Sequence, residues 1–343
     1  MRYVRAIIAV VMIPIFAAVA YGVCPLNGPS ALKVGKGKGS LRSGSAVLYG
    51  PSMATIEVVG SIGAPNLIFV GVGGGGAGGS AGGSGFAGNP NNDNGGGGGG
   101  GAGAPLLAFS VTAKKGDAFE VSLGSGGTVV GPGGRMGTPG AKGGDGSGSI
   151  VRRHSGSPLL TFPGATGGAG GIGSTNQPAV ASGGSGTQGG SSGGAGGAVP
   201  APPSEGGKPS QITPAVSIGG GTDPGNGAGG GGGGSALCVG GNGGHGGTFA
   251  GAPGDAKQGL PGTRGAGGGG AGARGEGGEP GLVGGVGGNG VVIVLWGDDA
   301  KDFPTAVAGP TAGVTLSPAG LKRVRDAIAK VGSNPGDFCT CAP

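Results

Sequence analysis

Two apolar, strand-like runs bracket a long region dominated by glycine, and this bracket constrains the fold more than any other feature of the sequence. Residues 66–72 (NLIFVGV) lead into near-continuous glycine as far as residue 101, and residues 284–290 (GGVGGNG) lead into residues 291–296 (VVIVLW). Glycine supplies 101 of the 343 residues, whereas an ordinary chain contains about 7%. Tracts without side chains cannot build a conventional core, so they either stay disordered or pack backbone against backbone.

Short apolar runs outside the tracts predict β-strands. The first pair of candidates is residues 55–59 and residues 67–70. We expect the second pair, residues 106–112 and 118–123, to form a β-hairpin, because Gly116-Asp117 supplies turn residues between two alternating runs. The run 291–296 is apolar throughout, which is typical of a strand buried on both faces. Weaker candidates are residues 149–151, 159–162 and 215–218.

The tracts themselves have an ordered solution. In polyproline geometry a chain repeats every three residues, and parallel helices of glycine can exchange backbone hydrogen bonds with one another. Side chains are then tolerated only where a helix faces outward, as we expect for Leu282 and Val283. A collagen stalk shares this period, but the register breaks at Ala271 and proline is sparse. A strict period of three holds at Gly272, Gly275, Gly278, Gly281, Gly284, Gly287 and Gly290.

The N-terminus combines two basic residues, Arg2 and Arg5, with the uncharged apolar run 6–23. Residues 18–20 (AVA) provide a small-x-small cleavage site before Tyr21, as in a secretory signal peptide. The run is also about long enough for a marginal transmembrane anchor, and a buried core helix is a third interpretation. A cleaved signal or a retained anchor both predict an extracytoplasmic location: secreted, on a cell surface or in a virion.

The C-terminal part differs in composition from the glycine region. Ser317-Pro318 is typical of the start of an α-helix and Gly332 of its end. Leu321, Val324, Ile328 and Val331 fall on one stripe, which predicts a small helix docking on a neighbour; a membrane-surface helix is the alternative.

We therefore expect a mainly β fold with packed polyglycine-II-type helices, an N-terminal hydrophobic signal or anchor helix, and a short C-terminal α-helix. The predicted parts are a signal peptide or anchor (1–23), a flexible Gly/Ser/Lys arm (24–52), a glycine-rich β/polyglycine domain (53–297), a linker (298–316), and a C-terminal helix with a cysteine-containing tail (317–343).

The four cysteines are disulfide candidates, because an even number outside the cytosol favours pairing. They are Cys24, Cys238, Cys339 and Cys341. Three pairings are open. A bond between the two C-terminal cysteines would close a strained ring, so links from them back to the other two are favoured.

Catalytic and cofactor chemistry has little support in this sequence. Only His154 and His245 are present, and Cys238 with His245 would supply half a metal site at most. We expect no enzyme activity, no cofactor and no metal. The basic residues are scattered and not interleaved with aromatics, so the composition does not favour nucleic acid. An Asx-rich loop is either an exposed turn or a displayed contact loop: Asn89, Asn91, Asn92, Asp93 and Asn94.

The order of these motifs resembles the glycine-rich domains of phage tail-fibre and adhesin-tip proteins and of related bacterial surface proteins. It runs from an apolar strand into residues 73–76 (GGGG), through residues 123–127 (LGSGG) and 143–147 (GGDGS), to the closing residues 287–296. The resemblance covers about residues 53–297. It implies a small β-scaffold carrying a sandwich of polyglycine helices, whose loops form a receptor-binding tip.

Three functions follow as expectations. The first is an exported structural or adhesive surface protein whose rigid scaffold displays loops to a receptor, a glycan or another surface or virion protein. The second is a virion component anchored in a membrane by residues 6–23, and the third is a largely disordered matrix protein. Homo-oligomers fit any of them. The expected contact loops are residues 86–94, 152–162, 174–182, 199–216 and 248–264.

Overall fold

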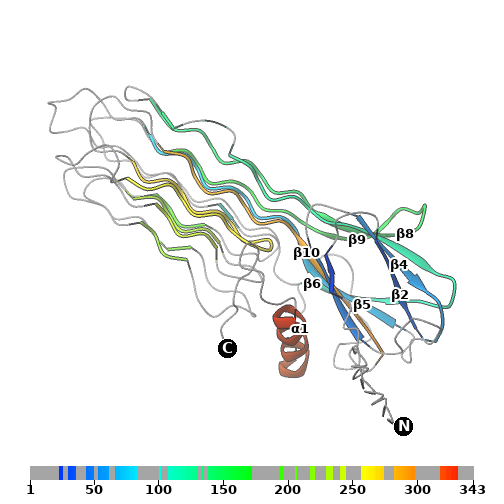
Figure 1. Cartoon of the computed structure of the whole chain (residues 1–343). Helices are drawn as coiled ribbons and strands as arrows, with labels where there is room; N and C mark the ends of the chain where they lie inside the picture. Colours follow the sequence, from blue (N-terminus) through cyan, green and yellow to red (C-terminus); the bar gives the residue numbers. More distant parts are fainter. Residues whose placement is uncertain are drawn as a thin grey trace, which may run out of the picture.

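The computed structural model shows a mainly β fold with two sheets and one short helix. A bundle of glycine-rich segments extends from the sheets in one direction, so that the described part of the chain is elongated (Figure 1). We call the paired sheets the sandwich and the glycine-rich segments the shaft. The structure describes residues 23–25, 30–35, 44–49, 53–61, 66–82, 100–101, 107–129, 131, 133–134, 138–171, 193–196, 205–206, 217–220, 229–234, 240–244, 256–273, 282–297 and 317–330.

The first sheet is built around the last strand in the sequence. Its order is β1 (Val23–Pro25), β3 (Gly44–Tyr49), β10 (Val291–Trp296), β5 (Asn66–Val72) and β6 (Leu107–Thr112). β10 is antiparallel to both of its neighbours, and β1 runs parallel to β3. Every residue of β10 is buried, so the prediction of a strand buried on both faces is confirmed.

The second sheet has the order β2 (Ser30–Val34), β4 (Met53–Val58), β7 (Ala118–Ser122), β8 (Ser149–Arg153) and β9 (Pro158–Phe162). Residues in β4 and β7 alternate between buried and half-buried. This is the period of two that places one face of a sheet against a core and leaves the other toward solvent.

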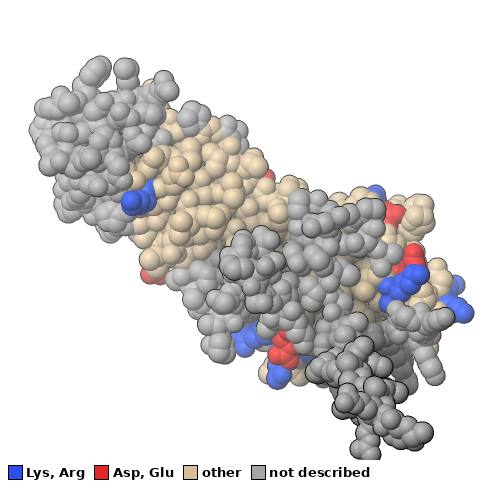
Figure 2. Space-filling view, in the orientation of Figure 1, with Lys and Arg blue, Asp and Glu red and all other residues tan. Residues whose placement is uncertain are grey.

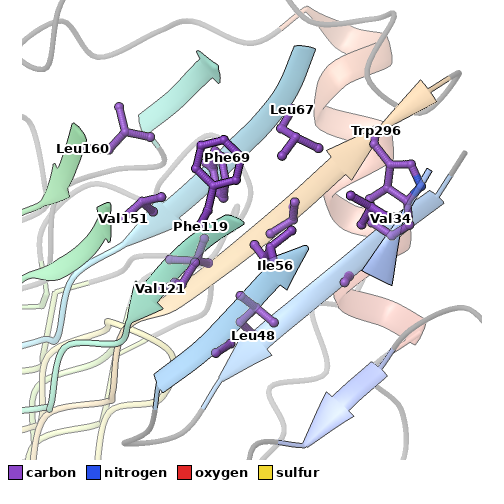
Figure 3. Close-up of a cluster of buried hydrophobic side chains, with 14 of the residues drawn as sticks. Val34, Leu48, Ile56, Leu67, Phe69, Phe119, Val121, Val151, Leu160 and Trp296 are labelled. Carbon is purple, nitrogen blue, oxygen red and sulfur yellow. The ribbon is translucent and has the colours of Figure 1, made fainter. Parts of the chain in front are cut away.

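The core lies between the two sheets and is rich in aromatic rings (Figure 3). Phe69 of β5 meets Phe119 of β7 edge to face, with ring centroids 5.9 Å apart. Phe109 of β6 meets Phe162 of β9 in the same way at 5.6 Å. Full burial of such side chains stabilises the fold by about 1.5–3 kcal/mol each. The core therefore ties the first sheet to the second.

The predicted β-hairpin of residues 106–112 and 118–123 is wrong. β6 pairs with β5 in the first sheet, whereas β7 pairs with β4 and β8 in the second. The turn chemistry is as expected, since Gly116 has φ +94° and the Asp117 carboxylate accepts from the Lys114 amide at 3.0 Å. The turn crosses from one sheet to the other, because Phe109 and Phe119 each bury their rings in the same core from opposite sides.

The predicted flexible arm, residues 24–52, is also wrong in part. β2 and β3 lie inside this range: β2 belongs to the second sheet and β3 to the first. The short apolar runs around Leu32 and residues 46–48 are long enough for strands once a neighbouring strand supplies hydrogen bonds. Lysine and glycine around those runs conceal them in the sequence.

The single helix of the described residues is α1 (Pro318–Lys330). Ser317 caps it, because its hydroxyl accepts from the Gly320 amide at 3.1 Å. Val324 is fully buried, and α1 contacts β3. The predicted docking helix is confirmed. Within the described residues no helix combines the length and the apolar character that crossing a bilayer requires; the proposed anchor, 6–23, lies almost wholly outside them.

Candidate functional site

Residues 74–81 form the centre of the shaft and continue directly from β5. Their amide groups donate to backbone carbonyls of other segments in a regular order. Every third amide donates to the same neighbouring segment, and the partner residue moves by three at each step. Gly74, Ala77 and Ser80 donate to Ser147, Gly144 and Ala141, while Gly75, Gly78 and Ala81 donate to Gly288, Gly285 and Leu282.

The carbonyl groups of the same segment repeat this order. Gly74, Ala77 and Ser80 accept from Ala165, Gly168 and Gly171, while Gly76 and Gly79 accept from Gly268 and Ala271. The Gly76 amide also donates to Gly101, and the Gly75 carbonyl accepts from Gly127. Residues 74–81 are thus hydrogen-bonded to six other segments, a pattern that neither an α-helix nor a β-strand can make.

A second segment, residues 266–273, has the same environment. Its amides donate to residues 76–79, 231–234 and 257–260, and its carbonyls accept from Gly100, residues 241–244 and residues 285–288. The two central segments bond to each other. Buried backbone groups must be paired, and here they are paired in three dimensions rather than within one sheet.

The spacing between segments leaves no room for side chains at most central positions. A Cβ added at Gly78 would lie 2.0 Å from the carbonyl oxygen of Gly269, and one at Gly76 would lie 1.9 Å from that of Thr166. Ala77 and Ala81 show that a methyl group is accepted at selected places, where each is fully buried. The glycine content is therefore a packing requirement of the shaft.

Burial in residues 282–290 follows a period of three, but Leu282 and Val283, the residues expected to face outward, are both half-buried. Gly284, Gly287 and Gly290 are buried, whereas Val286 between them is 45% exposed. Leu282, expected on an outer face, is half-buried and packs against Ala81 and two other alanines of the shaft. The expectation that Leu282 and Val283 face outward is therefore wrong, whereas the glycines at every third position are buried.

Described residues around Ser80 and Ala81 form the end of the shaft remote from the sandwich, which we call the distal end. Ala81 is hydrogen-bonded to Gly134 and Leu282, and Ser80 to Ala141 and Gly171. Ala271 and Ala273 pack with Ala81 and Leu282 at the same place. The expected loops 86–94 and 174–182 follow Gly82 and Gly171 in the sequence and lie outside the described residues, and so do Asn89, Asn91, Asn92, Asp93 and Asn94.

Not every expected contact loop belongs to that end. Residues 152–162 form the β8–β9 hairpin at the end of the sandwich remote from the shaft, which we call the free end (Figure 1). The turn at Arg264 and Gly265, at the end of the expected loop 248–264, lies at the junction of sandwich and shaft, because a Cβ at Gly265 would meet Val72. The expected loops are therefore not one surface.

The junction depends on a serine that the sequence does not single out. Ser149 is fully buried; its hydroxyl donates to the Val72 carbonyl at 3.0 Å and accepts from the Gly124 amide at 2.9 Å. It thereby joins β5, β8 and Gly124, the second residue after β7. A serine within a glycine-serine run carries no signal that would have identified this role.

On the shaft, Asp145 links two segments. Its Oδ1 accepts from the Gly167 amide at 2.8 Å and pairs with Lys142 at 2.9 Å. The Gly167 hydrogen bond and then the Lys142 contact hold the pKa of Asp145 below its ordinary value. A carboxyl group whose pKa is lower in the folded state stabilises the fold above its unfolded-state pKa, and this stabilisation is lost as the pH falls through the folded-state pKa.

We expect Asp145→Ala to lower the free energy of unfolding by about 0.5–1 kcal/mol at pH 7, and by less at an acidic pH below the folded-state pKa of the group, where the wild-type carboxyl group is protonated. Urea unfolding of both proteins at the two pH values measures this. Asp145→Asn keeps an acceptor oxygen for Gly167 and should lose less at pH 7 than the alanine variant. Equal losses at both pH values would contradict the assigned role of the charge.

The free end carries the clearest charged cluster of the described residues. Glu120 pairs with Arg152 and His154, each at 2.7 Å, and Asp117 pairs with Arg153 at 3.0 Å. The hydrogen bonds from Arg152 and then His154 lower the pKa of Glu120. Burial raises the pKa of Asp117, but the Lys114 amide and Arg153 outweigh it and the pKa is lowered. Both carboxyl groups are charged at neutral pH.

The described surface of the shaft carries fewer charges on the face shown in Figure 2, where a broad tan area is interrupted by a few charged groups. In the described part of the chain, no group of three or more metal-ligating side chains occurs. The disulfide candidates fall outside the described residues, apart from the backbone of Cys24 in β1. A scan of protein-family models finds no family that matches the chain, and no curated protein is significantly similar to it.

Proposed function

We propose that this protein is an exported structural or adhesive protein, in which a rigid glycine-rich shaft holds contact loops away from a β-sandwich. The loops that leave the distal end, residues 86–94 and 174–182, are the parts that meet a receptor, a glycan or another surface or virion protein. The role is structural and binding, not catalytic.

The hydrogen bonding around residues 74–81 is the observation that carries this proposal. Partners that advance by three residues at each step match the repeat of polyproline geometry, which has three residues per turn. We therefore infer that the shaft segments are polyglycine-II-type helices. A segment bonded on six sides cannot bend independently, so the shaft would transmit force and position its tip.

This arrangement is the one that the resemblance to glycine-rich phage tail-fibre, adhesin-tip and bacterial surface domains implies. In that interpretation the sandwich is the base and the distal loops are the variable, partner-specific part. The shaft suits this division into a constant base and variable loops, because loops between its segments can vary in length while the segments keep their register.

A second candidate is a virion protein held in a membrane by residues 6–23. Strand β1 favours it, because it begins at Val23, where the apolar run ends. A retained anchor would then join the sandwich without a flexible linker. N-terminal sequencing of the mature protein distinguishes this candidate from a secreted form that begins near Tyr21.

The third expectation, a largely disordered matrix protein, predicts faster hydrogen exchange of the backbone amides than the proposed shaft does. Hydrogen exchange at residues 74–81 should be slow for the proposed shaft and as fast as in a free peptide for a disordered chain. The measurement needs no knowledge of the partner.

Binding by the distal loops is tested by replacing residues 86–94 with a Gly-Ser sequence of equal length. Wild-type protein and the variant are applied to a printed glycan array and to a panel of intact bacterial cells. We expect at least a tenfold loss of wild-type binding, with the thermal unfolding midpoint unchanged. The matched control replaces residues 154–157 at the free end and should keep wild-type binding to the glycan array, which presents no phospholipid. Wild-type binding by the loop variant would refute the tip assignment.

A further inference from the structure

We propose that the free end of the sandwich is a docking surface for an anionic phospholipid bilayer. The occupant is the layer of phosphodiester headgroups, and the shaft points away from it. The inference extends the second candidate role, in which residues 6–23 remain in a membrane.

The surface is made by two turns that lie side by side. One is the crossing turn, residues 113–117, and the other is the β8–β9 turn, residues 154–157. Arg153 connects them, because its guanidinium donates to the Thr112 carbonyl at 3.2 Å and pairs with Asp117 at 3.0 Å. The His154 amide also donates to the carbonyl of Ala118 at 2.9 Å. Both turns therefore belong to one face.

Positive groups occupy the outside of this face and negative groups lie beneath them. The side chains of Arg152, Arg153 and His154 are 38%, 45% and 65% exposed, whereas those of Asp117 and Glu120 are 14% and 16% exposed. Lys114 and Lys115 add two exposed cations on the crossing turn. The ion pairs are neutral in sum, but an approaching surface meets the cations first.

Lys33 and Glu57, paired in register on β2 and β4, also lie toward this end. Among the described residues, this face has five cations and three carboxylates, a net charge of +2 without His154. The cations are Lys33, Lys114, Lys115, Arg152 and Arg153, and the carboxylates are Glu57, Asp117 and Glu120. Nearby lysine and arginine residues attract anionic leaflets by roughly fivefold in binding for each residue. The pattern fits headgroup phosphates better than a flat apolar partner.

The direction of the chain selects a bilayer as the occupant. β3 runs from the free end, where Gly44 pairs with Trp296, toward the shaft, where Tyr49 pairs with Val291. β1 is parallel to β3, so the chain enters β1 from the direction of the free end. Val23 lies level with Val47, three residues from Gly44, so a membrane segment that ends near residue 20 would emerge beside the free end and hold its exposed lysines against the headgroups.

Lysine footprinting of the full chain tests the docking. The protein is incubated with vesicles of phosphatidylcholine alone or with about one third phosphatidylglycerol, then acylated with a membrane-impermeant amine reagent. Mass spectrometry compares Lys114 and Lys115 with Lys257, an exposed reference on the shaft. We expect phosphatidylglycerol to slow acylation of both lysines about fivefold relative to Lys257. The protection should disappear in about 0.5 M salt, because ions screen exposed charges.

Two variants make the test specific. Lys115→Glu should reduce the protection of Lys114, whereas Lys142→Glu, the same charge change on the shaft, should leave it unchanged. Equal acylation with both vesicle types, salt-independent protection, or an equal effect of the two variants would overturn the proposal. Stable insertion into pure phosphatidylcholine separately tests the anchor role, so failure of the anchor and failure of the docking face give different results.

Discussion

Gly78→Ala is expected to unfold the shaft or to destabilise the protein by at least about 3 kcal/mol, at the upper end of the cost of overpacking a core. The added Cβ would lie 2.0 Å from the carbonyl oxygen of Gly269. Ordinary cores relieve such clashes by moving a side chain. Here the nearest atoms are backbone, and the segments on all sides are hydrogen-bonded to others. The substitution must therefore break the register of several segments at once.

Chemical unfolding monitored by circular dichroism, together with hydrogen exchange at residues 74–81, measures the effect. The matched control is Gly148→Ala, where the nearest atom to the new Cβ is the Phe162 carbonyl oxygen at 3.1 Å. A shift of a few tenths of an ångström accommodates that methyl group, so we expect a loss below about 1.5 kcal/mol. If both variants lost the same stability, close approach of backbones would not be the reason for glycine at position 78.

Phe69→Ala is expected to destabilise the sandwich by about 3–5 kcal/mol, the usual cost of removing a buried phenyl ring. Phe69 is fully buried and contacts Phe119 across the core. The effect should reach the shaft, because β5 continues into residues 73–82 and residues 282–290 continue into β10. Sandwich and shaft then unfold as one cooperative unit.

Two probes follow the two parts of the molecule. Fluorescence of Trp296, the only tryptophan, reports on the sandwich, and hydrogen exchange at residues 266–273 reports on the shaft. Both should change at the same, lower urea concentration in Phe69→Ala. Phe69→Leu, which keeps most of the apolar volume, should lose only about 1 kcal/mol. A shaft that keeps its protection after the sandwich has unfolded would show two independent units.

Strand positions could be predicted where apolar residues stand out against glycine. Residues 66–72 and 291–296 were found in this way, and so was α1 from its Ser317 cap. The pairing partners of the strands could not be predicted in this way, because strands adjacent in the sequence are expected to pair and here several do not. β6 and β7 follow each other in the chain but belong to different sheets, and β10 inserts between β3 and β5, far from both in the sequence.

The candidate sites likewise divide into those that residue type identifies and those that only tertiary contacts reveal. The Asx-rich loop and the cysteines are recognised by residue type, and they lie outside the described residues except for the backbone of Cys24. The charged face of the free end was visible only as separate residues, such as Lys114 and Arg152. Ser149 had no signal at all. The Ser149–Gly124 hydrogen bond and the Arg152–Glu120 ion pair each join residues more than 20 positions apart in the sequence.

By itself, the sequence determined that the glycine tracts can approach other backbone closely, because a residue without a Cβ removes the steric limit on that approach. It also determined where strands could form, since those runs are the places with enough apolar surface to bury. Only the tertiary structure decided which segments meet. Backbone amides are chemically identical along a glycine tract, so the partner of Gly78 is selected by the strands that enter the shaft and their order in the two sheets, not by any property of Gly78 itself.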